Sequence, residues 1–162
     1  MWSFISTWAF SRQAAEAGAE LLKSGGRAMD AVIDGIHRVE SDPEVDCVGR
    51  GGFLNEKGEL ALDAAVMDGD TLKTGAVCAV RGFEHPVDIA RALMDKTRHN
   101  ILVGEGAEEF ARKMGIPESA ISRIRAARAE ITAPRSVQAA GSSSVFPSPF
   151  LPRAGSSPSP VR

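Results

Sequence analysis

Cysteine is scarce in this sequence of 162 residues, which has only Cys47 and Cys78. Two cysteines do not make a disulfide framework, and these two lack the spacing of metal ligands. We therefore interpret both as small buried hydrophobic side chains. The sequence predicts no metal site and no cofactor.

Charge of one sign is also missing. The 19 basic and 21 acidic residues give a net charge of −2, and the basic residues are scattered along the chain. Nucleic-acid binding requires a basic patch that releases phosphate counterions, so we expect no nucleic-acid partner.

Long apolar runs are absent, because no stretch approaches the ~18 apolar residues of a membrane helix. Residues 1–6 lack the basic and apolar regions of a signal peptide. The chain is 43% hydrophobic and 25% charged, an ordinary globular balance. These features predict a soluble protein without a membrane partner and with one domain.

Hydrophobic periodicity predicts elements over about the first 118 residues. Residues 2–8 are aromatic and β-branched and predict a strand. Ser11 is a candidate cap for a helix that ends at Gly25 and Gly26, and a second helix follows until Pro43. Residues 51–67 read as a hairpin around a turn at 55–58.

The next segments predict a strand, two helices and a short apolar bridge. Residues 75–80 are apolar almost throughout, so we expect this strand to be central in the sheet and covered on both faces. Pro86 suits the first turn of a third helix, and residues 101–103 form an apolar bridge to a fourth that begins near Glu105. Paired helices around a mostly antiparallel sheet indicate an α+β fold.

The composition changes beyond about residue 130. Residues 131–162 form an irregular tail in which serine and proline dominate from 136 onward. We therefore divide the chain into a folded part, 1–130, and a Ser/Pro-rich tail, 131–162.

Local chemistry alone identifies no active site. Gly104, Glu105 and Gly106 resemble a phosphate loop, but nearby carboxylates at the helix start would repel phosphate, which favours a structural turn. The carboxylates of Asp63, Asp68 and Asp70 lack the dense spacing of a calcium loop, which favours turn and capping roles.

The three histidines give no clear catalytic pattern either. His37, His85 and His99 are scattered along the sequence. No serine or cysteine occupies a nucleophile elbow, so a catalytic triad has little support.

Four segments taken together resemble one family. They are Thr-Trp-Ala-Phe at 7–10, Ser-Gly-Gly-Arg-Ala-Met-Asp-Ala-Val at 24–32, Leu-Asp-Ala-Ala-Val-Met-Asp-Gly at 62–69 leading to 75–77, and 85–107 with Thr-Arg-His-Asn-Ile-Leu-Val-Gly-Glu-Gly-Ala at its end. In this order they resemble glycosylasparaginase (aspartylglucosaminidase) and its relatives, the isoaspartyl-peptidase and plant-type asparaginases. The resemblance covers about residues 5–118, and the Thr-Trp start and residues 48–52 favour the glycosylasparaginase branch.

The resemblance implies an αββα sandwich of the N-terminal nucleophile hydrolases, here a partial one formed by the α-chain part with a disordered C-terminal tail. Family members cleave themselves to free a threonine whose own amino group is the base. Trp8 matches the tryptophan that lines the family's substrate cleft; a buried aromatic side chain is the structural alternative. The implied partners are a β-chain-like portion or a full-length homologue, and a small amide substrate.

The family's cleavage motif, Asp-Thr or Gly-Thr followed by Ile/Val-Gly, is not present in these 162 residues. Asp70-Thr71 is a superficial match, but Lys73 stands where the motif has glycine. We therefore assign no catalytic residue, and whether this chain is an enzyme stays open. The resemblance implies a lysosomal location for an animal glycosylasparaginase and a cytoplasmic one otherwise.

Three interpretations remain open from the sequence. The chain is an α-chain-like part of a glycosylasparagine- or asparagine-hydrolysing enzyme, a non-catalytic fragment or isoform that binds a full-length partner, or a distinct small α+β binding module. The resemblance disfavours the third.

Residues 136–162 are predicted to have no fixed structure, because they hold too little apolar surface to offset chain entropy. Limited digestion with a broad-specificity protease should cut this stretch before any bond within 1–119. Amides protected from exchange throughout 136–162 would contradict this prediction.

Overall fold

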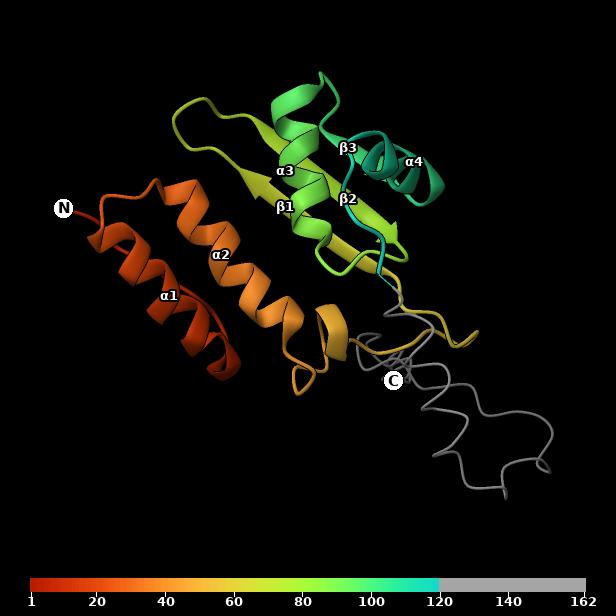
Figure 1. The fold of residues 1–162 in the computed structure, drawn as a ribbon, viewed down its shortest axis with the longest axis horizontal. Coiled ribbons are helices and arrows are strands. Elements are labelled where there is room, and N and C mark those ends of the chain that lie inside the picture. Colours follow the sequence, from red (N-terminus) through yellow and green to blue (C-terminus); the bar gives the residue numbers. More distant parts are fainter. Residues whose placement is uncertain (120–162) are drawn as a thin grey trace, which may run out of the picture. The chain divides into compact units, whose positions relative to one another are not determined.

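The computed structural model describes residues 1–119. Helices and strands follow in the order α1 (Arg12–Lys23), α2 (Ala28–Ser41), β1 (Leu62–Met67), β2 (Thr74–Val80), α3 (Pro86–Lys96), β3 (Ile101–Val103) and α4 (Glu105–Lys113) (Figure 1). Two short 3-10 turns are η1 (Ala9–Ser11) and η2 (Gly49–Gly51). All four predicted helices are confirmed. The proposed boundary near 130 and the tail 131–162 lie outside the described residues.

The sheet has the order β1-β2-β3, so the predicted central position of β2 is confirmed. β1 pairs with β2 in antiparallel orientation, whereas β2 and β3 are parallel. The expected mostly antiparallel sheet is therefore a mixed one. The apolar bridge at 101–103 becomes a strand because α3 returns the chain to the far edge of β2.

Helices α3 and α4 pack against one face of this sheet and enclose the main core. Val66, Val77 and Val80 point to this face and pack with buried side chains of both helices. The backbones of α3 and β2 approach closely at Gly75, where an added Cβ would lie 2.1 Å from the carbonyl oxygen of Ala90. Glycine at 75 therefore sets how deeply α3 settles on the sheet.

The opposite face of the sheet is open among the described residues. Ala65, Ala76 and Ile101 are partners across the three strands and share this face. Ile101 is 56% exposed and Val103 58% exposed. The expectation that β2 is covered on both faces is therefore wrong for residues 1–119. A run of small and apolar residues is also compatible with a strand that has one face uncovered.

The N-terminal segment contacts the pair formed by α1 and α2. An added Cβ on Gly18 of α1 or Gly35 of α2 would come within 3.3 Å of the Phe4 ring, so the ring packs against both glycines. The predicted strand at 2–8 is wrong, because Phe4 makes this side-chain contact and residues 2–8 do not join the described sheet.

The predicted hairpin at 51–67 is displaced along the chain. Its turn at 55–58 is present, closed by the Asn55 amide donating to the Glu59 carbonyl at 2.9 Å. Residues 51–54 form no strand, because Gly49 and Gly51 of η2 pack against the backbone of Glu40 and Val45. The hairpin is instead β1 and β2, joined by 68–73.

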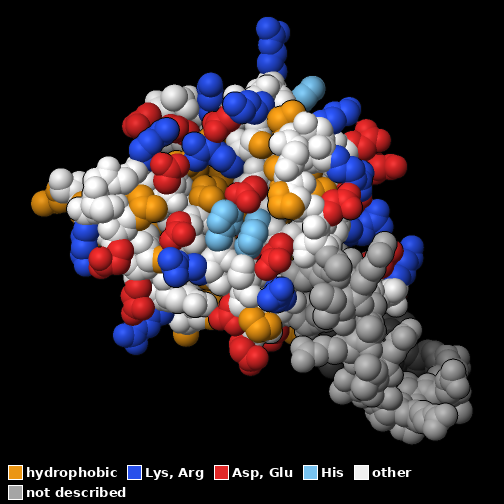
Figure 2. Space-filling view, in the orientation of Figure 1, with side chains coloured by type: hydrophobic (Ala, Val, Ile, Leu, Met, Phe, Trp, Pro, Cys, Tyr) orange, Lys and Arg blue, Asp and Glu red, His pale blue; other side chains and the backbone are white. Residues whose placement is uncertain are grey.

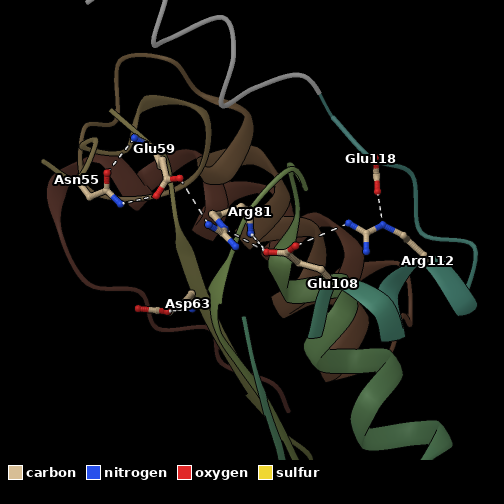
Figure 3. A network of polar contacts seen from close by, with 8 residues as sticks. Asn55, Glu59, Asp63, Arg81, Glu108, Arg112 and Glu118 are labelled. Atoms are coloured by element: carbon tan, nitrogen blue, oxygen red, sulfur yellow. Dashed lines mark hydrogen bonds and ion pairs between the residues drawn. The ribbon is translucent and has the colours of Figure 1, made fainter. Parts of the chain in front are cut away.

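A chain of polar contacts ties the 55–59 turn to β2 and α4 (Figure 3). The buried Glu108 carboxylate accepts hydrogen bonds from the backbone amide and from Nε of Arg81, at 3.2 and 3.3 Å. Arg81 also lies 3.6 Å from Glu59, and Arg112 pairs with both Glu108 and Glu118. Glu108 thereby holds the end of β2 against α4.

These elements define an α+β fold with a small three-stranded sheet. Cys78 is half-buried and Cys47 is exposed, so the interpretation of both as buried side chains is wrong for Cys47. None of the helices within 1–119 has the length and hydropathy needed to cross a bilayer.

Gly75→Ala should destabilise the protein by about 2 kcal/mol, because the methyl group would push α3 away from the sheet. Gly106→Ala in α4 is the matched control, since nothing lies within 4 Å of an added Cβ there. Urea denaturation of both variants measures the difference. Equal midpoints for Gly75→Ala and the wild type would refute this account of the helix–sheet contact.

Candidate functional site

A cavity of about 650 Å³ lies between the N-terminal segment, α2 and β1. Phe4, Trp8 and Phe10 line it from the N-terminal side, and Ile36 and Val39 from α2. Residues 61–65 form the wall on the β1 side. The volume is in the range of small-molecule sites, and the lining combines aromatic and aliphatic groups with a few polar ones.

Trp8 lines this cavity and is exposed to solvent. The residue is 77% exposed, which excludes the alternative of a buried structural aromatic. Its ring is stacked in parallel with Phe10, with centroids 6.3 Å apart and an interplanar angle of 6°. Two aligned aromatic faces beside a cavity suit an apolar or sugar face of a ligand.

The backbone at Trp8 adopts φ 70° and ψ 149°, a conformation that side-chain-bearing residues rarely take. Such strain costs about 1–3 kcal/mol and is often found at functional sites. Ser11, which is buried, compensates: its hydroxyl donates to the carbonyl oxygens of Thr7 and Trp8, the latter at 2.8 Å. Its backbone amide also donates to Trp8 at 3.2 Å. Ser11 thus acts on the strained turn, and not as the side-chain helix cap that the sequence suggested.

Glu40 is a buried acidic residue in the cavity wall, with 5% exposure. It belongs to a cluster of four titratable side chains that joins α2 to α3. His85 Nδ1 lies 2.9 Å from the Glu40 carboxyl group, and His37 Nε2 lies 2.8 Å from Asp88. The two imidazole rings are 4.3 Å apart between centroids. Figure 2 shows adjacent histidine side chains flanked by carboxylates on this face.

Burial and neighbouring charge move the pKa values of this cluster in different directions. Burial, reinforced by the charge of Asp88, raises the pKa of Glu40 to about 8. The hydrogen bond to Asp88 raises the pKa of His37, whereas burial and the charge on His37 lower the pKa of His85. At neutral pH, Glu40 is therefore protonated beside a neutral His85 and donates its proton to Nδ1.

Ser41, His85 and Glu40 are arranged in the order of a serine–histidine–acid triad, but they do not form one. Ser41 Oγ is 3.5 Å from His85 Nε2. With Nδ1 accepting from Glu40, the neutral ring carries its proton on Nε2 and cannot take one from the serine. Ser41 also ends α2, where the last turn presents carbonyl oxygens and not the N–H donors that an oxyanion requires.

Two of the three aspartates, Asp63 and Asp68, accept backbone hydrogen bonds and so have structural roles, as their spacing predicted. Asp63 accepts the Ala79 amide at 2.7 Å, where the pairing of β1 with β2 shifts register and Ala79 has φ 53°. Asp68 accepts the amides of Asp70 and Thr71 at 2.9 and 3.0 Å, and these bonds lower its pKa. Within 1–119, no three His, Cys, Asp or Glu side chains are placed to hold a metal ion.

Gly104, Thr71 and Thr97 have structural roles. Gly104 has φ 52° and begins α4. Thr71 lies in the exposed turn between β1 and β2, where its hydroxyl accepts the Lys73 amide at 3.4 Å. Thr97 donates to the Leu93 carbonyl at the end of α3. Thr132 lies outside the described residues.

Comparison with known proteins identifies the class. The family model described as asparaginase matches residues 6–150. The chain belongs to this family of amide hydrolases, which confirms the resemblance carried by the four segments. The match extends further along the chain than those segments indicated.

Curated relatives of both branches are similar to the chain. It is 50% identical over 107 residues to the isoaspartyl peptidase/L-asparaginase of Danio rerio and 44% identical over 106 residues to that of Homo sapiens, covering 66% and 65% of this chain. It is 41% identical over 111 residues to the N(4)-(beta-N-acetylglucosaminyl)-L-asparaginase of Elizabethkingia miricola, covering 68% of this chain. The matches span 34%, 34% and 32% of those relatives, so the chain corresponds to about a third of their length.

Sequence reasoning proposed Trp8 as a substrate-binding residue and missed the cluster of Glu40, His37, His85 and Asp88. Two signals were available: His37 and Glu40 are three residues apart on α2, and His85 and Asp88 are three apart at the start of α3, so each pair lies on one helical face. That the two faces meet follows only from the packing of the helices.

Ser11→Ala should cost about 1 kcal/mol of stability, because the carbonyl oxygens of Thr7 and Trp8 lose a buried donor. Fluorescence of Trp8, measured in a Trp2→Phe background, should change with the freed turn. Ser24→Ala is the control, since that hydroxyl also donates to a main-chain carbonyl but is exposed. Identical stability and fluorescence in Ser11→Ala and the control would argue against a support role for Ser11.

Proposed function

We propose that this chain contributes the substrate-side part of an amide hydrolase whose full domain is an αββα sandwich. Its substrate is a small amide such as asparagine, an isoaspartyl peptide or a glycosylasparagine. The observation that carries the proposal is the asparaginase family match over residues 6–150.

Trp8 is the residue that we assign to substrate binding. Its exposure, its place at the cavity and its strained, braced backbone support this assignment. The stacked pair of Trp8 and Phe10 offers a flat apolar surface on which a sugar ring can lie, which favours a glycosylasparagine substrate. The relatives include enzymes named for each substrate, so the choice between them rests on this surface.

The attacking threonine comes from a portion other than residues 1–119 in this proposal. Amide attack needs an activated nucleophile, a base within ~3 Å and oxyanion donors. The hydroxyls of Thr71 and Thr97 are engaged with the backbone. A β-chain-like portion or a full-length homologue therefore completes the site.

The open sheet face supports such a partner. It presents Met67, Ile101 and Val103, each more than half exposed, on one side of the sheet. A second layer packed on this face would bury them and complete a sandwich. The same observation supports a second candidate function, a non-catalytic chain that binds a full-length partner through this face.

A chimera tests the proposal. Residues 5–118 replace the matched third of the Elizabethkingia miricola relative, and hydrolysis of glycosylasparagine and asparagine is measured. Turnover by the chimera supports a substrate-side role. A chimera that folds, matures and turns over neither amide contradicts it.

Within the active chimera, Trp8→Ala should raise KM for glycosylasparagine about fivefold, because a lost aromatic stacking contact is worth ~1 kcal/mol. The value of kcat should change much less, since Trp8 does not contact the attacking group. Phe53→Ala, an exposed aromatic residue outside the cavity lining, is the matched control. An equal effect of both variants would remove Trp8 from the site.

The 162-residue chain purified alone should release neither ammonia nor aspartate from these amides and should not cleave itself, as judged by mass spectrometry. Activity that persists on purification and is lost in Thr71→Ala would make Thr71 the nucleophile.

A further inference from the structure

The cluster of His37, Glu40, His85 and Asp88 lies on the seam between α2 and α3. Two hydrogen bonds shorter than 3 Å cross this seam: His37 pairs with Asp88, and Glu40 pairs with His85. Glu40 reaches the start of α3, where the backbone amide of Val87 also donates to it. The cluster therefore joins α2 to the start of α3.

Other charged groups near the cluster are mostly paired with partners of their own. On α2, Asp34 pairs with Arg38 at 3.2 Å and influences His37. Before α3, Glu84 lies 3.9 Å from Arg50 of η2 and acts on Glu40 and His85. Further along α3, Arg91 is bound by Asp30 and Asp95. The acidic groups that shift the pKa values within the cluster are Asp88, which is one of its members, and Asp34 and Glu84, which lie outside it.

We propose that these four side chains form a hydrogen-bonded clasp that holds α2 against α3 while the buried Glu40 keeps its proton, and that the clasp opens when Glu40 ionises. When the clasp loses its protons, a buried Glu40 carboxylate faces Asp88 and Glu84 across two neutral imidazoles. Like charges in a poorly solvated seam repel, and an ionised Glu40 can no longer donate a hydrogen bond to His85.

The direction follows from the two raised pKa values. Glu40 is raised from 4.5 to about 8, so the folded state binds the extra proton throughout that window and stability falls as the pH rises across it. The raised pKa of His37 acts in the same direction above 6.5. His85, whose pKa is lowered, acts in the opposite direction only below 6.5.

Opening of the clasp changes the cavity that holds Trp8. Glu40 and Val39 of α2, with Pro86 and Val87 of α3, all line this cavity. A ligand that binds the closed form would in return favour the protonated cluster, because linkage is reciprocal. The clasp does not depend on the proposed amidase activity, since it concerns only residues described in this chain.

Hydrogen exchange of the full 162-residue chain between pH 5.5 and 8.5 tests the proposal. After correction for base-catalysed exchange, opening at the amides that begin α3 should rise about tenfold per pH unit between roughly pH 6.5 and 8 for the proton of Glu40, and more steeply where His37 also releases its proton. Amides of β2 serve as the internal reference.

Glu40→Gln should flatten this slope, because the amide donates to His85 at every pH. Glu44→Gln, an exposed acidic residue just beyond α2, should keep the wild-type slope. His37→Gln should reduce the slope in part. A wild-type slope in Glu40→Gln overturns the proposal.

Carbon NMR of the Glu40 carboxyl group gives a second readout that needs no variant. Its midpoint should lie near 8. A titration midpoint of Glu40 near its ordinary value of 4.5 also overturns the proposal. This holds whether the midpoint arises because water enters the seam or because the chain does not fold alone.

Discussion

The close approach of α3 to β2 at Gly75 is the contact on which the rest of the described structure depends. Without a side chain at 75, the backbone of α3 comes to rest on the sheet and its buried residues meet Val77 and Val80. This position of α3 fixes where His85, Pro86 and Val87 lie at its start. The cluster on the α2–α3 seam and one wall of the cavity are therefore consequences of how the helix sits on the sheet.

Among residues 1–119 the sheet is covered on one side and open on the other, which is unusual for a strand as apolar as β2. The small side chains of Ala65 and Ala76 keep the open face flat, and the larger apolar side chains of Met67, Ile101 and Val103 are exposed on the same face. A flat apolar face favours close packing of a second layer. The chain belongs to the asparaginase family, and its matches span about a third of the curated relatives' length. In the proposed enzyme, this face is therefore the interface with the remaining portion.

The cavity and the titratable cluster share Glu40. On one side its carboxyl group lies in the wall that faces Trp8, and on the other it meets His85. A carboxyl group in this position is protonated because burial penalises its charge more than its neighbours stabilise it. Strain at Trp8 and a buried acid at Glu40 thus meet in one region, which is where departures from ordinary packing are expected in a functional site.

Local patterns in the sequence were sufficient for the four helices, for β2 as the central strand and for the turn role of Asp68, because helix periodicity and turn chemistry act between residues a few positions apart. The four segments also indicated the family and drew attention to Trp8. Tertiary packing alone decided the rest. Phe4 packs on glycines of α1 and α2, the hairpin is formed by β1 and β2, and one sheet face is open among residues 1–119. The pairing of His37 with Asp88, across 51 residues of chain, depends on two helices meeting at one seam, which no local pattern specifies.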